Sequence, residues 1–341
     1  GEGPSGRRGA GLRVHPILGR VKLIAEAWDA GGLYQVGSFP AWNRWSEWNG
    51  RFRDDLRCFL KGDYGMAQAA IERILGSADL YSPENRGENA TVNFLNCHDG
   101  FTLYDMYAYN WKHNEKNGWN NTDGDNNNNS WNCGEEGESM NPEVLALRNR
   151  MRKNSFAVLM CSRGAAMFLA GDEFCNTQFG NNNAYCQDNE ISWIDWSRKE
   201  QYSEMFEFCK FMIQLRKEHP ILRGRSGPSG CGFPEVSVHN SKAWNAECNQ
   251  DTHTIGVMFA GRNASNTEDD IIYIGVNTFW EYCDIELPKL PLGRKWKVLV
   301  NTEFEHTQDV DYDLLTRRKS DILLTMCPRS VLVARVEKYF E

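Results

Sequence analysis

Short apolar runs alternate with amphipathic stretches over the first two thirds of the chain. The runs Val21–Ala25, Thr91–Cys97 and Ala165–Ala170 have the length and composition of buried strands. Other stretches repeat apolar residues at helical spacing, and Asn141-Pro142 is a good start signal for one of them. The predicted helices cover residues 53–60, 66–75, 142–162 and a segment that includes 205–215. This alternation predicts a parallel α/β unit.

The pattern changes at about residue 225, after which short apolar runs are separated by turns. No long helix is predicted there, and this texture is typical of a small antiparallel β domain. We therefore divide the chain into residues 1–13, a Gly/Arg-rich disordered or foreign leader, residues 14–223, a partial (β/α) barrel, and residues 224–341, a β-sandwich. Three or four strand-plus-helix repeats precede residue 223. A TIM (β/α)8 barrel takes about 250 residues, so the α/β unit is about half of one.

Composition excludes several classes of protein. Hydrophobic residues make up 41% of the 341 residues, enough for a sizeable core, so global disorder is excluded. The net charge of −8 argues against nucleic acid as a partner. No apolar run approaches the length needed to span a bilayer, so we expect no membrane partner. Eleven cysteines without a CxxC pair favour a reduced, cytoplasmic setting. Twelve Trp and twelve Tyr suit a protein that handles carbohydrate, although core filling explains this composition better by itself.

Two of the predicted strands end in a carboxylate. Glu26 follows Val21–Ala25, and Asp99 follows Thr91–Cys97. Enzymes that cleave glycosidic bonds need carboxyl groups flanking one bond, and barrel enzymes place them at C-terminal strand ends. By position alone, a structural role for Glu26 in capping a helix or pairing with an arginine is the better interpretation. Asp172 and Glu173 also end a strand, but a structural role in closing the barrel is at least as good an interpretation as contact with substrate, so we do not count them as catalytic candidates.

Two loops are rich in asparagine. Residues 110–138 form a loop longer than a connection needs, and the buried-looking Trp131 and Cys133 favour an ordered structure. Its Asp/Asn run at 123–129 could supply calcium ligands, but it lacks the Gly and Glu of an EF-hand loop. A solvated or substrate-facing loop is therefore favoured, and we expect no metal and no cofactor. The second loop covers residues 180–189.

Longer motifs carry a family resemblance. Residues 25–37 (AEAWDAGGLYQVG) resemble the general-acid region of the isoamylase and glycogen-debranching branch of the α-amylase superfamily, and residues 93–103 (NFLNCHDGFTL) resemble its later His-Asp region. Further matches lie at residues 109–114, 130–137 and 180–189. The resemblance covers roughly residues 14–223 in order, and the β-rich tail stands where the family has its C-terminal domain. It implies the C-terminal half of a TIM barrel followed by an antiparallel β-sandwich.

The resemblance also implies roles for individual residues. Glu26 takes the place of the general acid/base and Asp99 that of the residue that stabilises the transition state, while His98 and Trp28 are expected to bind substrate. Glu26 suits the acid role if burial beside Trp28 favours its protonated form, because desolvation disfavours the ionised form. The family's nucleophile is an aspartate in an Arg-x-Asp motif after the fourth strand, and no such segment precedes Glu26. A truncation or a reading-frame break near residue 13 would explain this.

Two functions follow from these observations. The first is a retaining glycoside hydrolase that cleaves α-1,6 branch linkages in an α-glucan such as glycogen, amylopectin or limit dextrin, once the missing half is supplied. The alternative is a catalytically inactive glucan-binding fragment.

Overall fold

The computed structural model describes residues 15–39, 44–82, 90–224 and 227–338. The predicted leader, residues 1–13, lies outside the described residues.

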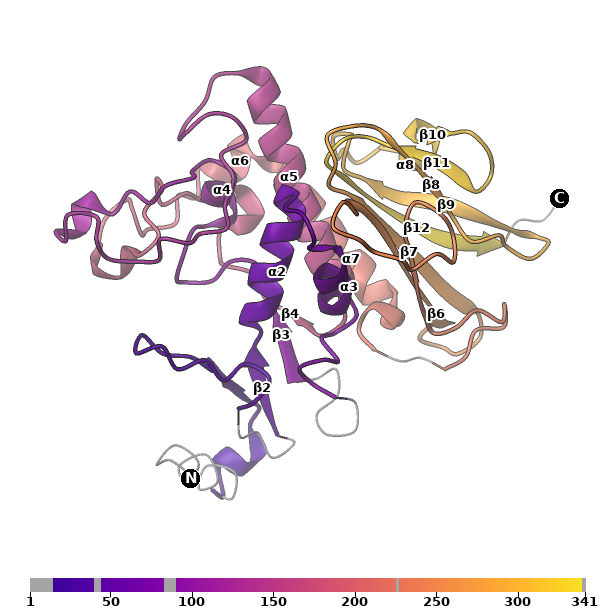
Figure 1. Ribbon diagram of the computed structural model, residues 1–341, viewed down its shortest axis with the longest axis horizontal. Coiled ribbons are helices and arrows are strands. Elements are labelled where there is room, and N and C mark those ends of the chain that lie inside the picture. The colour runs from indigo at the N-terminus through magenta and orange to yellow at the C-terminus, as the bar shows by residue number, and fades with distance from the viewer. Residues whose placement is uncertain (1–14, 40–43, 83–89, 225–226, 339–341) are drawn as a thin grey trace.

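An α/β region and a β-rich region lie side by side (Figure 1). The α/β region holds the strands β1 (Leu23–Ala25), β2 (Trp45–Trp48), β3 (Thr91–Asn93) and β4 (Ala165–Ala166), and the helices α2 (Gly50–Lys61), α3 (Ala67–Ile74), α4 (Leu103–Met106), α5 (Pro142–Cys161), α6 (Arg198–Gln201) and α7 (Ser203–Glu218). Its 3-10 helices are η1 (Leu18–Arg20), η3 (Glu115–Asn117), η4 (Asp172–Phe174), η5 (Ala184–Cys186) and η6 (Pro220–Leu222).

The four strands of the α/β region form a parallel sheet in the order β1-β2-β3-β4. The predicted parallel arrangement is therefore confirmed. Strand β2 was not predicted, because its segment is rich in Gly and Trp and was expected to be a loop. The strands expected at residues 91–97 and 165–170 are shorter than predicted and end at Asn93 and Ala166. Gly164 lets β4 approach β3, because a Cβ at this position would lie 2.5 Å from the Thr91 methyl group.

The predicted helices form at the expected places. Helix α2 begins at the Asn49 cap, whose side chain accepts a hydrogen bond from the Phe52 amide, and it ends at Gly62 in the left-handed conformation with φ 91°. Helix α5 begins after Asn141, whose side chain accepts from the Glu143 amide at 3.0 Å. These local signals fix where the helices that support the sheet begin and end.

The β-rich region contains a five-stranded and a three-stranded antiparallel sheet, in the orders β5-β6-β7-β12-β9 and β10-β11-β8. The elements are β5 (Val236–His239), β6 (Thr254–Arg262), β7 (Asp269–Asn277), β8 (Cys283–Glu286), β9 (Arg294–Asn301), α8 (Tyr312–Leu315), β10 (Arg317–Arg318), β11 (Leu323–Met326) and β12 (Ser330–Lys338). The predicted antiparallel β domain is thus confirmed, while the boundary at residue 224 stays a prediction.

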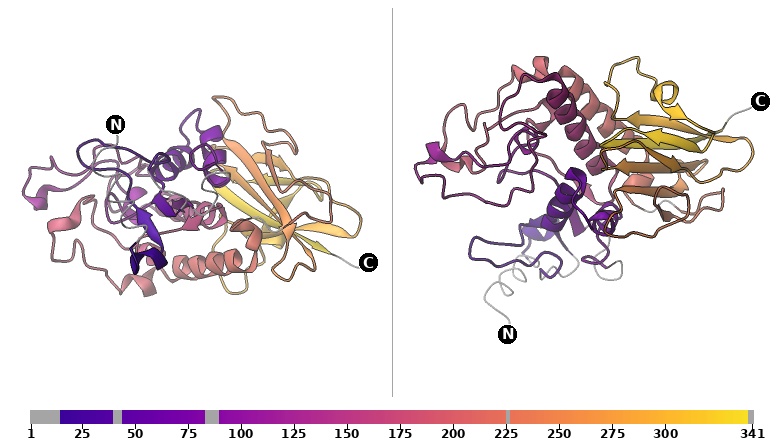
Figure 2. Two further views of the ribbon diagram at one scale, coloured as in Figure 1. Left: turned by 90° about the horizontal axis from the view of Figure 1, so that it is seen from below. Right: turned by 45° about the horizontal axis from the view of Figure 1, so that its top comes forward.

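Both faces of the five-stranded sheet are buried, and this explains its nearly continuous apolar strands. In β6, Ile255 and Val257 join the core that contains the helices of the α/β region, whereas Met258 and Ala260 join a second core against the three-stranded sheet. The two regions therefore share one hydrophobic core. Figure 2 shows the helices packed along one side of the large sheet.

Polar contacts join the two regions around α5. The Lys153 ammonium donates to Glu204 at 2.9 Å and to the Phe304 carbonyl at 2.7 Å. Asn154 donates to the Arg329 carbonyl and accepts from the Thr302 hydroxyl, at 2.8 and 2.6 Å. These buried contacts hold the α/β region and the β domain in one orientation.

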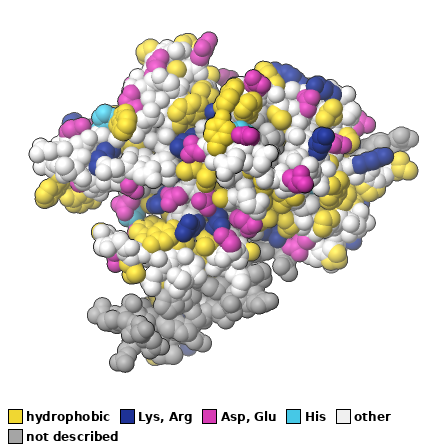
Figure 3. All heavy atoms as spheres, viewed as in Figure 1, with side chains coloured by type: hydrophobic (Ala, Val, Ile, Leu, Met, Phe, Trp, Pro, Cys, Tyr) yellow, Lys and Arg dark blue, Asp and Glu magenta, His cyan; other side chains and the backbone are white. Residues whose placement is uncertain are grey.

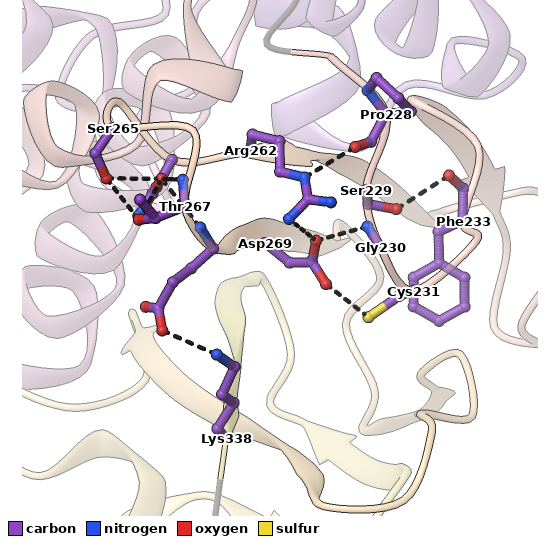
Figure 4. Close-up of polar contacts among 12 residues, drawn as sticks. Pro228, Ser229, Gly230, Cys231, Phe233, Arg262, Ser265, Thr267, Asp269 and Lys338 are labelled. Atoms are coloured by element: carbon purple, nitrogen blue, oxygen red, sulfur yellow. Dashed lines mark hydrogen bonds and ion pairs between the residues drawn. The ribbon is translucent and has the colours of Figure 1, made fainter.

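The segment that enters the β domain is fixed by Asp269 (Figure 4). Its carboxylate accepts from the Gly230 amide at 2.6 Å and from the Cys231 thiol at 3.2 Å, and it pairs with Arg262 and Arg294 at 3.4 and 2.8 Å. Burial raises the pKa of Asp269, but these donors outweigh it and hold the pKa below the usual value. All eleven cysteines are free thiols. Over the described ranges, no helix has the length and apolar character needed to cross a bilayer.

Candidate functional site

The two predicted catalytic carboxylates follow strands of the same parallel sheet. Glu26 comes directly after β1, and Asp99 follows β3, with β2 between the two strands. Both therefore lie at the C-terminal edge of the sheet. Two strand spacings separate the strand backbones by about 10 Å.

The environment of Glu26 differs from the expected one. Ala25 and Ala27 are buried, but the Glu26 side chain is exposed. Trp28 is half-buried and stacks between the rings of Tyr34 and Phe94, with centroid distances of 6.2 and 6.5 Å. The burial beside Trp28 that would favour the acid role of Glu26 is not present in this structure, because Trp28 packs against Tyr34 of its own loop and against Phe94, which follows β3.

His98 and Asp99 form an exposed pair. The His98 Nε2 atom lies 3.5 Å from Asp99 Oδ2, and both side chains are 60% exposed. The His98 ring packs against Trp48 with centroids 5.7 Å apart. The turn continues through Gly100, which has φ +86° and donates its amide to the Asn182 carbonyl at 2.9 Å. Imidazole and carboxylate are both accessible to a ligand.

A cavity of about 370 Å³ lies beside this turn. Trp28 and Asp99 line it, whereas Glu26 and His98 do not. The other polar and aromatic lining residues are Asp29, Tyr34, Arg53, Asp54, Arg57, Asp125, Asn127, Asn128, Asn182 and Asn183. Those from residues 125–128 belong to the loop expected to be solvated or substrate-facing, whereas Arg53, Asp54 and Arg57 were not predicted to line a site. The space-filling view shows a hollow on the face of Figure 1, with charged side chains gathered along it (Figure 3). An aromatic wall with acidic and amide groups opposite is suited to a polyhydroxylated ligand.

Arg57 fixes two walls of this cavity. Its guanidinium is buried and donates to the Leu95 carbonyl at 2.8 Å and to the Asn128 carbonyl at 2.9 Å. Burial, reinforced by the charge of Arg53, lowers the pKa of Arg57 to about 10. The arginine thus joins α2 both to the segment after β3 and to the first Asn-rich loop. A buried arginine that binds only carbonyls leaves no signal in the sequence.

Side-chain amides join the two Asn-rich loops. Asn114 donates to Asn182 at 2.8 Å, and Asn182 donates to Asn128 at 2.7 Å. Asn117 and Asn183 both donate to the Oδ2 atom of Asp123, each at 2.8 Å. The predicted order of the 110–138 loop is therefore confirmed. No group of three His, Cys, Asp or Glu residues that could hold a metal ion occurs where the chain is described.

Asp172 and Glu173 make structural contacts. The Asp172 carboxylate is buried and accepts from the Leu103 amide at 2.8 Å, and Glu173 accepts from the Gly171 amide at 2.8 Å. Burial raises the pKa of Asp172 to about 7. These contacts hold α4 and the turn after β4, in agreement with the structural interpretation.

Solved structures share this fold. The chain matches a pullulanase from Bacillus acidopullulyticus with a TM-score of 0.62 and 18% identity, over 97% of this chain and 36% of the pullulanase. It matches a pullulanase from Anoxybacillus sp. LM18-11 in complex with maltotriose with a TM-score of 0.63 and 18% identity, over 96% of this chain and 40% of that one. The chain thus has part of the α-amylase fold with its C-terminal β domain.

Sequence comparison finds relatives among isoamylases and GlgX homologues. The chain is 42% identical to the chloroplastic isoamylase SU1 of Zea mays over 312 residues, which are 91% of this chain and 38% of that protein. It is 48% identical to a glycogen operon protein GlgX homologue of Mycobacterium tuberculosis over 215 residues, 63% of this chain and 30% of the homologue. No family model matches. The predicted resemblance to the isoamylase and glycogen-debranching branch of the α-amylase superfamily is confirmed. The chain spans less than two fifths of the length of isoamylase SU1.

Proposed function

We propose that the α/β region is the C-terminal half of a (β/α)8 barrel and that residues 224–341 are the β-sandwich domain behind it. The parallel order β1-β2-β3-β4 supports this assignment, and helices lie between β2 and β3 and between β3 and β4. The matched share of isoamylase SU1 leaves room for a further half-barrel in a protein of that length. Residues that complete the site would come from the other half.

The activity that fits this arrangement is retaining hydrolysis of α-1,6 branch linkages in glycogen or a starch-like glucan. Glu26 would donate a proton to the leaving oxygen, and Asp99 would stabilise the positive charge that develops at the anomeric carbon. His98 would bind sugar hydroxyls, and Trp28 would stack against a pyranose face. The observation that carries the proposal is the placement of Glu26 and Asp99 at one edge of the sheet, two strands apart.

The exposure of Glu26 bears on whether the chain is active by itself or only together with the other half-barrel. A general acid needs a raised pKa, which burial supplies, and in this structure Glu26 is exposed. In the proposed active form, the other half-barrel packs against the C-terminal edge of β1 and shields this carboxyl group. The chain alone is then inactive and binds glucan through its cavity, which is the second candidate function. The cytoplasmic location stays a prediction, and the matched isoamylase of Zea mays is named chloroplastic.

The test is an assay of reducing ends released from amylopectin. The 341-residue chain is compared with a chimera in which the part of Zea mays isoamylase SU1 that precedes the matched region is fused before Val14. We expect turnover by the chimera and none by the chain alone. A folded chimera without activity would contradict the proposed function. Turnover by the chain alone would contradict the inference that the nucleophile comes from the other half-barrel.

A further inference from the structure

A second cavity, of about 410 Å³, lies in the β domain and shares no lining residue with the first cavity. It is lined by residues of the loop between β5 and β6 and of the turn between β7 and β8, and by the first residue of β6 and of β8. Glu26, Trp28, His98 and Asp99 are absent from this lining. The cavity is therefore separate from the proposed catalytic site.

Two exposed aromatic rings belong to the turn between β7 and β8. Trp280 is 55% exposed and Tyr282 is 57% exposed, and Tyr282 lines the cavity. The Trp280 ring stacks on Phe279, another lining residue, with centroids 4.2 Å apart and planes inclined by 29°. The Arg317 guanidinium lies over the Tyr282 ring, 4.9 Å from its centroid. Each ring is thus held by a neighbour while more than half of the side chain stays accessible to a ligand.

The stack behind Trp280 extends into the protein. The Phe279 ring stacks on His253 with centroids 5.5 Å apart, and His253 is 5% exposed. Tyr64, from the loop between α2 and α3, packs edge-on against the same imidazole at a centroid distance of 5.1 Å. Because a buried ring fixes Phe279, the exposed Trp280 rests on a rigid support.

A buried asparagine fixes the backbone of the turn that carries both rings. Asn277 is 1% exposed, and its side-chain amide donates to the carbonyls of Glu281 and Cys327, both at 3.0 Å. Its side-chain oxygen accepts from the Phe279 amide at 3.0 Å. The turn therefore has its conformation before a ligand binds, which lowers the entropic cost of binding.

The cavity wall combines hydrogen-bond acceptors and donors. Asp251 and Glu281 are exposed, and no hydrogen bond to either carboxylate is present in the described part of the chain. The side-chain oxygen of Asn249 accepts from the Asp251 amide at 2.9 Å, which leaves the side-chain amide of Asn249 to donate. Sugar hydroxyl groups both donate and accept, so they replace the water that such a wall binds. An apolar ligand would remove this water without replacing its hydrogen bonds.

We propose that this second cavity binds glucosyl units of an α-glucan chain and so holds the polymer on the β domain. One pyranose ring stacks its C–H face on Trp280, and another stacks on Tyr282. Hydroxyl groups of the chain donate to Asp251 and Glu281 and accept from Asn249. The substrate class rests on the proposed function. The ligand site itself rests on the two supported rings and the carboxylates beside them.

The test is isothermal titration of the full chain with maltohexaose, with cellohexaose as the control ligand. Trp28→Ala eliminates binding at the first cavity and should leave a second event. We expect Trp280→Ala to weaken this event at least tenfold, because the stacking surface is lost. Glu281→Gln keeps the shape of an exposed side chain and should weaken the same event at least threefold with an unchanged Tm.

Two matched variants in the β domain serve as controls. Trp244→Ala removes a ring that is 50% exposed, and Glu247→Gln changes an exposed carboxylate of the loop between β5 and β6. Neither residue lines the cavity, so both variants should leave maltohexaose binding unchanged. Identical titrations for the Trp28→Ala chain with and without Trp280→Ala would overturn the proposal, as would equal binding of cellohexaose.

Failure of this site and failure of the proposed function give different results. If the site is absent, the chimera still releases reducing ends from amylopectin, whereas the Trp28→Ala chain shows no second event. If the proposed function fails, the chimera is inactive, whereas the Trp28→Ala chain still binds maltohexaose.

Discussion

The ring of Trp28 stacks on the ring of Phe94, with centroids 6.5 Å apart and planes inclined by 23°. This contact joins the segment that carries Glu26 to the segment that carries Asp99. The Arg53 guanidinium lies over both rings, 5.7 Å from the Trp28 centroid and 5.9 Å from that of Phe94. The two proposed catalytic segments are thus fixed to each other and to α2 by aromatic packing.

Replacing Trp28 with alanine should weaken both stability and glucan binding. The variant loses two aromatic stacks and a cation–π contact, so we expect the free energy of unfolding to fall by about 2 kcal/mol. Binding of maltotriose should weaken about tenfold, while Trp28→Phe keeps most of it. Urea unfolding and titration calorimetry measure the two effects. Trp244→Ala is the control, since it also loses an aromatic contact, in the β domain, and it should leave maltotriose binding unchanged.

Arg57 should be needed for the shape of the first cavity. Methionine at this position fills the space but leaves the Leu95 and Asn128 carbonyls without their donor. We expect Arg57→Met to lower the free energy of unfolding by about 2–4 kcal/mol, with faster proteolysis of residues 123–128. Chemical unfolding and limited proteolysis test this. Arg51→Met, on the exposed side of the same helix, should change stability by less than about 0.5 kcal/mol. An equal loss in both variants would contradict the role of Arg57.

Stability should depend on pH through two buried carboxyl groups. Burial raises the pKa of Asp172 to about 7 and that of Asp105 to about 6, so the folded chain binds their protons more tightly than the unfolded chain does. Their contribution to stability is fully present below about pH 4 and is lost as the pH rises through 7. Asp172→Asn keeps an acceptor for the Leu103 amide and does not titrate.

We therefore expect Asp172→Asn to raise stability relative to the original chain as the pH increases from 4 to 8, by at least about 1 kcal/mol at pH 8. Thermal unfolding at several pH values gives this difference. Asp321→Asn, at an exposed position of the β domain, should show no such trend. A constant difference between Asp172→Asn and the original chain across this range would show that the Asp172 carboxyl group titrates normally.

Local signals in the sequence predicted much of the fold. Asn141-Pro142 indicates the start of α5, and the apolar runs of β6 and β12 mark strands whose two faces are both buried. Strand β2 has no such signal, because its central residues Ser46 and Glu47 are polar yet almost completely buried. Glu47 is satisfied by the Gly37 amide at 2.7 Å. A polar strand of this kind is recognisable only once its partners are known.

The candidate site could be predicted only in part. The motifs around Glu26 and Asp99 identify the strand ends, and the parallel sheet brings those ends to one edge. The cavity wall formed by Arg53 and Asp54 could not be predicted, because these residues belong to a helix with an ordinary amphipathic pattern. The exposure of Glu26 was also missed, since burial depends on atoms far along the chain or outside it.

The central claim is that Glu26 acts as the proton donor of a site completed by a second half-barrel. The most direct measurement is the rate at which the isoamylase chimera releases reducing ends from amylopectin, with and without Glu26→Gln. We predict a loss of about 10²–10⁴-fold for Glu26→Gln and none for Glu207→Gln, a control on the surface helix α7. A Glu26→Gln chimera that keeps the full rate would contradict the account.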